Sequence, residues 1–69
     1  VQEFCMRGMN FPLDILWLGR GKVVGLEENV PARYSGTLRS PGPVSHVLEV
    51  PAGFCDRYRI KVGDPVTWQ

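Results

Sequence analysis

The residue best suited to do chemistry in this chain is Asp14, which stands inside the apolar segment FPLDILWL, residues 11–18. A buried carboxylate is costly unless a partner compensates its charge. Arg7 lies on the other side of a connection expected at residues 8–12, so two strands joined there would bring its guanidinium opposite Asp14. We favour a structural ion pair of Arg7 and Asp14. Two alternatives stay open: a pocket in which Asp14 is an acid/base or ligand-binding group and Arg7 holds an anion, or side chains that do not meet.

Four further side chains are candidates for lining such a pocket: Cys5, Met6, Met9 and His46. His46 lies in an apolar segment, where a histidine is more often a packed residue than a base. Met6 and Met9 carry flexible thioethers that could line a hydrophobic pocket, although core packing is the favoured interpretation. General acid/base catalysis usually needs a second titrating group within reach, and no nucleophile–base pattern is visible. The sequence therefore predicts no catalytic residues.

The two cysteines, Cys5 and Cys55, are far apart in the sequence. We favour two buried thiols that act as small hydrophobic groups. A disulfide that joins the two ends of the chain is the first alternative, and a metal site is the second. Zinc sites use paired ligands at short spacing, which two distant cysteines and one histidine do not provide. We accordingly expect no metal and no cofactor.

Composition excludes several classes of partner. Eight Lys and Arg balance seven Asp and Glu in the 69 residues, and the basic residues are scattered rather than clustered. Nucleic-acid binding is therefore not expected. No apolar stretch approaches the roughly 20 residues that span a bilayer, so membrane insertion is not expected either. The first residue is Val1, which indicates either a processed chain or a piece of a longer one.

Proline and glycine divide the chain into short apolar segments that are typical of strands. Residues 13–18 are apolar at nearly every position, which predicts a strand covered on both faces. Gly19-Arg20-Gly21 fits a tight hairpin turn, residues 31–43 are expected to form a loop, and residues 54–60 a short helix. The other expected strands are residues 3–7, 22–30, 44–50 and 65–68. The prediction is one mainly β domain over residues 1–69, a small sandwich or barrel-like fold with one short helix.

Several motifs resemble one known family. They are F-C-M-R-G-M-N-F-P-L-D-I-L-W-L at residues 4–18, V-L-E-V-P-A-G at residues 47–53 and I-K-V-G-D-P-V at residues 60–66. Together they resemble the domain of unknown function family 192, a bacterial and archaeal family without an assigned biochemical role. The resemblance implies a compact β-sandwich or barrel-like domain, and an extracytoplasmic setting because many members look exported. The matching characteristic positions are Phe4, Met6, Arg7, Pro12, Asp14, Gly53, Gly63 and Asp64.

The chain departs from the family in composition and in length. Cys5 stands where the family usually has tryptophan, and Gly8 where it usually has asparagine, so a pocket lined by Cys5 would be larger and less polar, or lost. Family members also have a further stretch before this point. The chain is thus expected to be the C-terminal part of the family's longer domain, without the N-terminal strands of that domain. Because an uncovered sheet edge invites pairing with another chain, we expect it to form a homo-oligomer.

The function expected from these observations is a non-enzymatic β module, either a ligand-binding domain or an accessory interaction domain. The first alternative is an enzyme that uses Asp14 and Arg7 in a pocket beside His46. The second is a truncated fragment without independent activity.

Overall fold

The computed structural model describes residues 3–5, 11–31 and 37–67 of the chain. It confirms a mainly β fold with a short helix. Among these residues, no helix has the length and apolar character of a bilayer-spanning segment. The elements are β1 (Glu3–Cys5), β2 (Leu13–Gly19), β3 (Lys22–Val30), β4 (Thr37–Arg39), β5 (His46–Pro51) and α1 (Phe54–Arg57).

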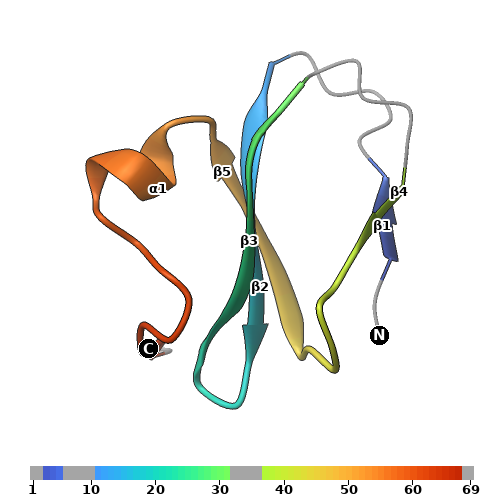
Figure 1. The fold of residues 1–69 in the computed structure, drawn as a ribbon, viewed down its shortest axis with the longest axis vertical. Helices are drawn as coiled ribbons and strands as arrows, with labels where there is room; N and C mark the ends of the chain where they lie inside the picture. The colour runs from blue at the N-terminus through green and yellow to red at the C-terminus, as the bar shows by residue number, and fades with distance from the viewer. Residues whose placement is uncertain (1–2, 6–10, 32–36, 68–69) are drawn as a thin grey trace.

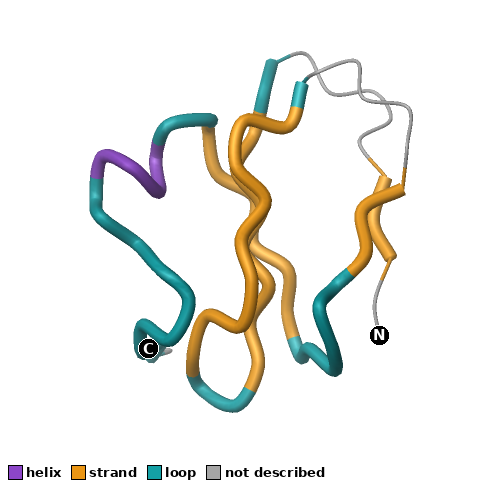
Figure 2. The backbone as a smooth tube through the Cα atoms, viewed as in Figure 1, coloured by secondary structure: helices purple, strands orange, loops and turns teal. Residues whose placement is uncertain are grey.

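The strands form two antiparallel sheets. The larger has the order β3-β2-β5, and the smaller pairs β1 with β4. Helix α1 and the C-terminal segment lie on one side of the larger sheet, and the β1–β4 pair lies on the other (Figure 1). In the trace of Figure 2, loops and turns connect β5 of the larger sheet to α1 on one side and to β4 on the other. The larger sheet is thus the middle layer of the domain.

Strand β2 is the centre of the core, because all seven of its residues are buried. Successive side chains of a strand point to opposite faces. Leu13, Ile15 and Trp17 therefore pack toward Leu38 of β4, while Leu16 and Leu18 pack on the other face against α1 and the C-terminal segment. The prediction that this segment is covered on both faces is confirmed.

The hairpin between β2 and β3 has the backbone that its sequence predicts. Gly19 pairs with Lys22, which leaves Arg20 and Gly21 as a two-residue turn. Both turn residues have positive φ, 55° at Arg20 and 74° at Gly21. Two consecutive positive φ values match the right-handed twist of the flanking strands. Gly21 adopts this conformation at little cost, whereas Arg20 does so against the usual preference of a residue with a Cβ.

Helix α1 begins where the sequence predicts but ends three residues earlier. Arg59 has a φ of 55°, and its N–H donates to the Asp56 carbonyl while the Ile60 N–H donates to the Cys55 carbonyl. This pair of bonds closes a helix around a left-handed residue, a position where glycine is most common. The arginine gives no sequence signal of a helix end, so the extension to residue 60 was wrong.

Three other predicted boundaries were wrong. The segment 31–43, expected to be a loop, contains β4, which pairs with β1 through Glu3 and Arg39. The terminal strand expected at residues 65–68 is a single bridge between Lys22 and Pro65 within the described part. Strand β5 begins at His46 rather than at residue 44. Short strands depend on a partner that the local sequence does not reveal, which explains the first two differences.

The close approach of a loop to β3 generates a stability prediction. A Cβ on Gly25 would lie 2.7 Å from Pro41 Cγ and 3.0 Å from Trp17 Cδ1. We expect Gly25→Ala to lower the free energy of unfolding by about 1–3 kcal/mol, because a rigid ring must move. Gly42→Ala is the matched control, since a Cβ there meets nothing within 4 Å. Equal urea midpoints for the two variants would contradict this packing.

Candidate functional site

Asp14 is fully buried, and its carboxylate accepts three backbone hydrogen bonds. Oδ1 accepts from the Asn29 N–H at 2.9 Å, and Oδ2 accepts from the N–H groups of Gly53 and Cys55 at 3.2 and 3.0 Å. Asn29 lies in β3, and Gly53 and Cys55 lie at the start of α1. Among the described residues the negative charge is therefore compensated by backbone amides.

A β-bulge brings Asn29 to the carboxylate. Leu13 pairs with Val30 and Ile15 with Glu27, so two residues of β3, Glu28 and Asn29, stand opposite Asp14. Asn29 has a φ of 55°, a left-handed conformation that asparagine tolerates better than most residues. A bulge of this type turns one backbone group out of the regular ladder. Here the freed N–H is the one that donates to Asp14.

The other two donors lie at the start of α1. Gly53 is the N-cap residue, with a φ of 93°, and has no side chain with which to cap the helix. The first N–H groups of a helix lack intrahelical acceptors. Asp14, from β2, supplies the acceptor for Gly53 and for Cys55, and so acts as a helix cap delivered by a distant strand.

Burial and hydrogen bonding oppose each other at this carboxyl group. Burial raises the pKa of Asp14, but the bonds from Asn29, Cys55 and Gly53 favour the charged form, and the net result is a pKa below the usual value. The group is therefore ionised at neutral pH with its lone pairs engaged. Such a carboxylate is a poor general base, because proton uptake would break the bonds that position it.

Cys55 lies beside Asp14 and is a free, buried thiol. Burial raises its pKa to about 11, and the neighbouring Asp14 carboxylate adds to the effect through its charge and a hydrogen bond. A thiol with such a pKa stays protonated near neutral pH and is a weak nucleophile. For Cys55, the structure agrees with the buried thiol that the sequence favoured and not with a disulfide.

Of the predicted site residues, the structure places Asp14 and His46 apart. Arg7, Met6 and Met9 lie outside the described residues, so their pairing and pocket-lining roles stay predictions. Cys5 belongs to β1. His46 is exposed and pairs with Leu18, four positions along β2 from Asp14, or about 13 Å at roughly 3.3 Å per residue. No group of three metal-binding side chains occurs in the described part of the chain.

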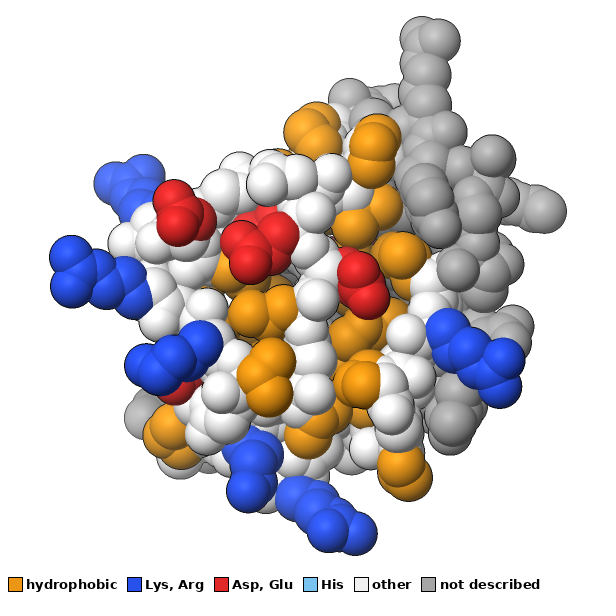
Figure 3. Space-filling model, in the orientation of Figure 1, with side chains coloured by type: hydrophobic (Ala, Val, Ile, Leu, Met, Phe, Trp, Pro, Cys, Tyr) orange, Lys and Arg blue, Asp and Glu red, His pale blue; other side chains and the backbone are white. Residues whose placement is uncertain are grey.

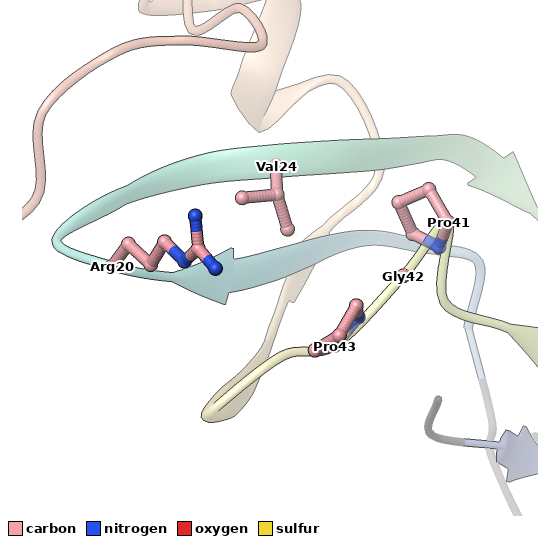
Figure 4. A pocket seen from close by; sticks show the side chains of 5 residues that line it. All are labelled: Arg20, Val24, Pro41, Gly42 and Pro43. Atoms are coloured by element: carbon pink, nitrogen blue, oxygen red, sulfur yellow. The ribbon is translucent and has the colours of Figure 1, made fainter.

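Sequence reasoning missed a hollow of about 300 Å³ beside the β2–β3 turn, which we call the hairpin hollow. Figure 4 shows Arg20 at the turn with its guanidinium directed back toward Val24, and Pro41 and Pro43 on the facing loop. The only sequence signal was the Ser-Pro-Gly-Pro run at residues 40–43. The hollow is lined by Arg20, Val24, Pro41, Gly42 and Pro43.

The walls of the hairpin hollow are held by close backbone contacts. Pro41 packs over Gly25, and the Pro43 carbonyl oxygen lies 3.3 Å from where a Cβ on Gly19 would stand. The Ser40 hydroxyl donates to the Gly42 carbonyl at 2.7 Å, which fixes the loop between the two prolines. Contacts within the chain therefore define the shape of the hollow.

The charged side chains on the face that Figure 3 shows are distributed around an apolar centre. Lys and Arg side chains lie along the rim, two of them side by side at its lower edge, and most of the acidic side chains lie in the upper half. They do not merge into one basic patch on this face. Among the described residues that line the hairpin hollow, Arg20 is the one charged residue.

The bonds to Asp14 predict a large effect of its removal. Asp14→Ala would leave three N–H groups without an acceptor, and we expect a loss of about 3–5 kcal/mol in the free energy of unfolding. Arg20→Ala, at an exposed turn, should cost less than about 1 kcal/mol. Urea denaturation of both variants measures the difference. Similar midpoints would show that the carboxylate does not hold the fold together.

The lowered pKa of Asp14 predicts acid sensitivity. Its contribution to stability is complete above the unfolded-state pKa of about 3.9 and is lost as pH falls through the lower folded-state value. Wild-type stability should therefore decline below about pH 4. Asp14→Asn has no such carboxylate, so its stability should decline less over the same range. Parallel curves of urea midpoint against pH for the two proteins would refute the assignment.

Comparisons with known proteins agree with this geometry. The chain is similar to a protein of unknown function from Novosphingobium aromaticivorans DSM 12444 whose crystal structure is known. The two sequences are 35% identical, and the structures superpose with a TM-score of 0.90. The match covers 97% of this chain and 49% of that one, so the chain spans about half the length of its structural relative. No curated protein matches the chain. The model of the DUF192 family, described as uncharacterized ACR, matches residues 1–68, and the chain therefore belongs to the DUF192 family.

Proposed function

We propose that this domain is a non-enzymatic binding module and that the hairpin hollow is its ligand site. The observation that carries the proposal is the guanidinium of Arg20 at a hollow whose other lining residues are Val24, Gly42 and two prolines. Ligand pockets combine such walls with a few polar groups that fix orientation. A small anion with an apolar body, such as an aromatic carboxylate, matches this lining in charge and polarity.

A buried donor beneath the loop supports an anionic ligand. The indole N–H of Trp17 is buried and has no acceptor among the described residues. Its ring neighbour Cδ1 lies against Gly25, next to Pro41. An unpaired buried donor costs free energy. An acceptor group of a ligand that reaches past Pro41 would relieve this cost, and a carboxylate has two such oxygens.

The other hypotheses have less support. An enzyme built on Asp14 needs an accessible carboxylate, whereas Asp14 is fully buried and lines none of the hollows found in the described part of the structure. His46, which this hypothesis places beside Asp14, lies at the start of β5, whereas Asp14 pairs with Val50 near the end of that strand. An accessory interaction domain is compatible with the same loop, and it differs from a ligand-binding domain in taking a macromolecule there.

A titration with sodium benzoate, followed by amide ¹H–¹⁵N NMR spectra, tests the ligand site. We expect saturable shifts at Val24 and Gly42, and affinity at least about tenfold weaker in Arg20→Ala, because a charge-assisted bond is lost. Benzamide, which is uncharged, should bind more weakly than benzoate.

Arg59→Ala is the matched control, since Arg59 is also an exposed arginine with a φ of 55° but lies beyond α1. Its benzoate affinity should equal that of the wild type. Benzoate shifts that do not saturate, or that survive Arg20→Ala unchanged, would overturn the proposal.

A further inference from the structure

Strand β5 leaves one of its edges without a partner in the described structure. It is the last strand of the larger sheet and pairs with β2 alone (Figure 1). The opposite edge strand, β3, differs because the C-terminal segment covers part of it. Val23 exchanges hydrogen bonds with that segment, donating to the Asp64 carbonyl and accepting from the Gly63 N–H. Among the residues that the structure describes, the sheet edge without a backbone partner is therefore that of β5.

The pairing register identifies which groups β5 presents outward. The Ala52 N–H donates to the Pro12 carbonyl, one step beyond the pair of Pro51 and Leu13. Antiparallel hydrogen bonds recur at every second residue. His46, Leu48 and Val50 thus direct their backbone groups toward β2, while Val47 and Glu49 direct theirs away from the sheet. Pro51 has the outward orientation too, but has no N–H.

We propose that β5 pairs antiparallel with β5 of a second copy of this chain, with Leu48 opposite Leu48 of the second copy. In this register the N–H and C=O groups of Val47 in each copy bond to those of Glu49 in the other. All outward donors of the strand are then satisfied. The pairing makes one continuous six-stranded sheet from two β3-β2-β5 sheets.

Charge selects this register over its neighbours. A register that centres on Glu49 would set two carboxylates directly opposite each other, and opposed like charges are destabilising. A register that centres on Val47 would leave the N–H of Glu49 opposite Ser45, which precedes the strand. Only pairing about Leu48 avoids both costs, because Glu49 then faces Val47.

The side chain of Leu48 favours the same pairing. It is 42% exposed although it lies within a strand, and it borders an apolar hollow that also includes Leu16 and Ile60. Residues that lie opposite each other without exchanging backbone hydrogen bonds, as the two Leu48 residues would, have Cα atoms about 4.5 Å apart. The two Leu48 side chains would cover each other and the rim of that hollow. Removing this apolar surface from water would stabilise the pairing.

Cysteine crosslinking tests both the association and its register. In a Cys5→Ser background, Leu48→Cys should form a disulfide-linked dimer under mild oxidation, since a Cα separation of about 4.5 Å suits a disulfide. Glu49→Cys is the matched control. Two copies of residue 49 would lie about 8 Å apart at their Cα atoms, beyond the reach of a disulfide.

Sedimentation of the unmodified chain and of Glu49→Pro completes the test. The wild type should be dimeric at tens of micromolar, and Glu49→Pro, which removes only an outward donor, should be a folded monomer. A monomeric wild type, a dimer that Glu49→Pro leaves intact, or crosslinking of residue 49 in preference to residue 48 would overturn the proposal. These results are independent of benzoate binding, so either proposal can fail alone.

Discussion

The structure depends on the burial of one carboxylate among backbone amides. Asp14 joins three parts of the chain, because it accepts from Asn29, 15 residues further on, and from Cys55, 41 residues further on. A helix of four residues has no stability of its own in water. Helix α1 persists because β2 supplies its cap and because Cys55 packs into the core beneath it. Asp14, the residue that the sequence marks as best suited for chemistry, thus connects β2 to β3 and to α1.

Because Asp14 is committed to the fold, the proposed binding site lies elsewhere, at the rim of the molecule. An ionised group whose oxygens already accept three hydrogen bonds has little capacity left for a ligand. The hairpin hollow, by contrast, has a charged donor, Arg20, in its lining. Its shape comes from glycines that let prolines approach, at Gly19 and Gly25. Close contacts of these prolines, rather than charges, shape the proposed site.

The sequence predicted those features that depend on local pattern. An apolar run interrupted only by Asp14 predicted β2 and its two covered faces, and Gly-Arg-Gly predicted the turn. It could not predict the partners of Asp14, because they are main-chain amides exposed by a bulge and by a helix start, and neither has a side-chain signature. The left-handed backbone of Asn29 and Arg59 could not be predicted either, since glycine is the expected residue at such positions. Strand β4 exists only through its pairing with β1.

The two edges of the larger sheet show how a small domain handles unpaired backbone. At β3, the C-terminal segment folds back, and Val66 donates to the Gly21 carbonyl beside the bridge of Lys22 and Pro65. At β5 the described chain provides no such cover, and the strand instead carries a proline at one end and a glutamate near its centre. Both residues are typical of edges that avoid indiscriminate pairing. They also restrict any pairing that does occur to a single register, so the features that limit aggregation are the same ones that would make association specific.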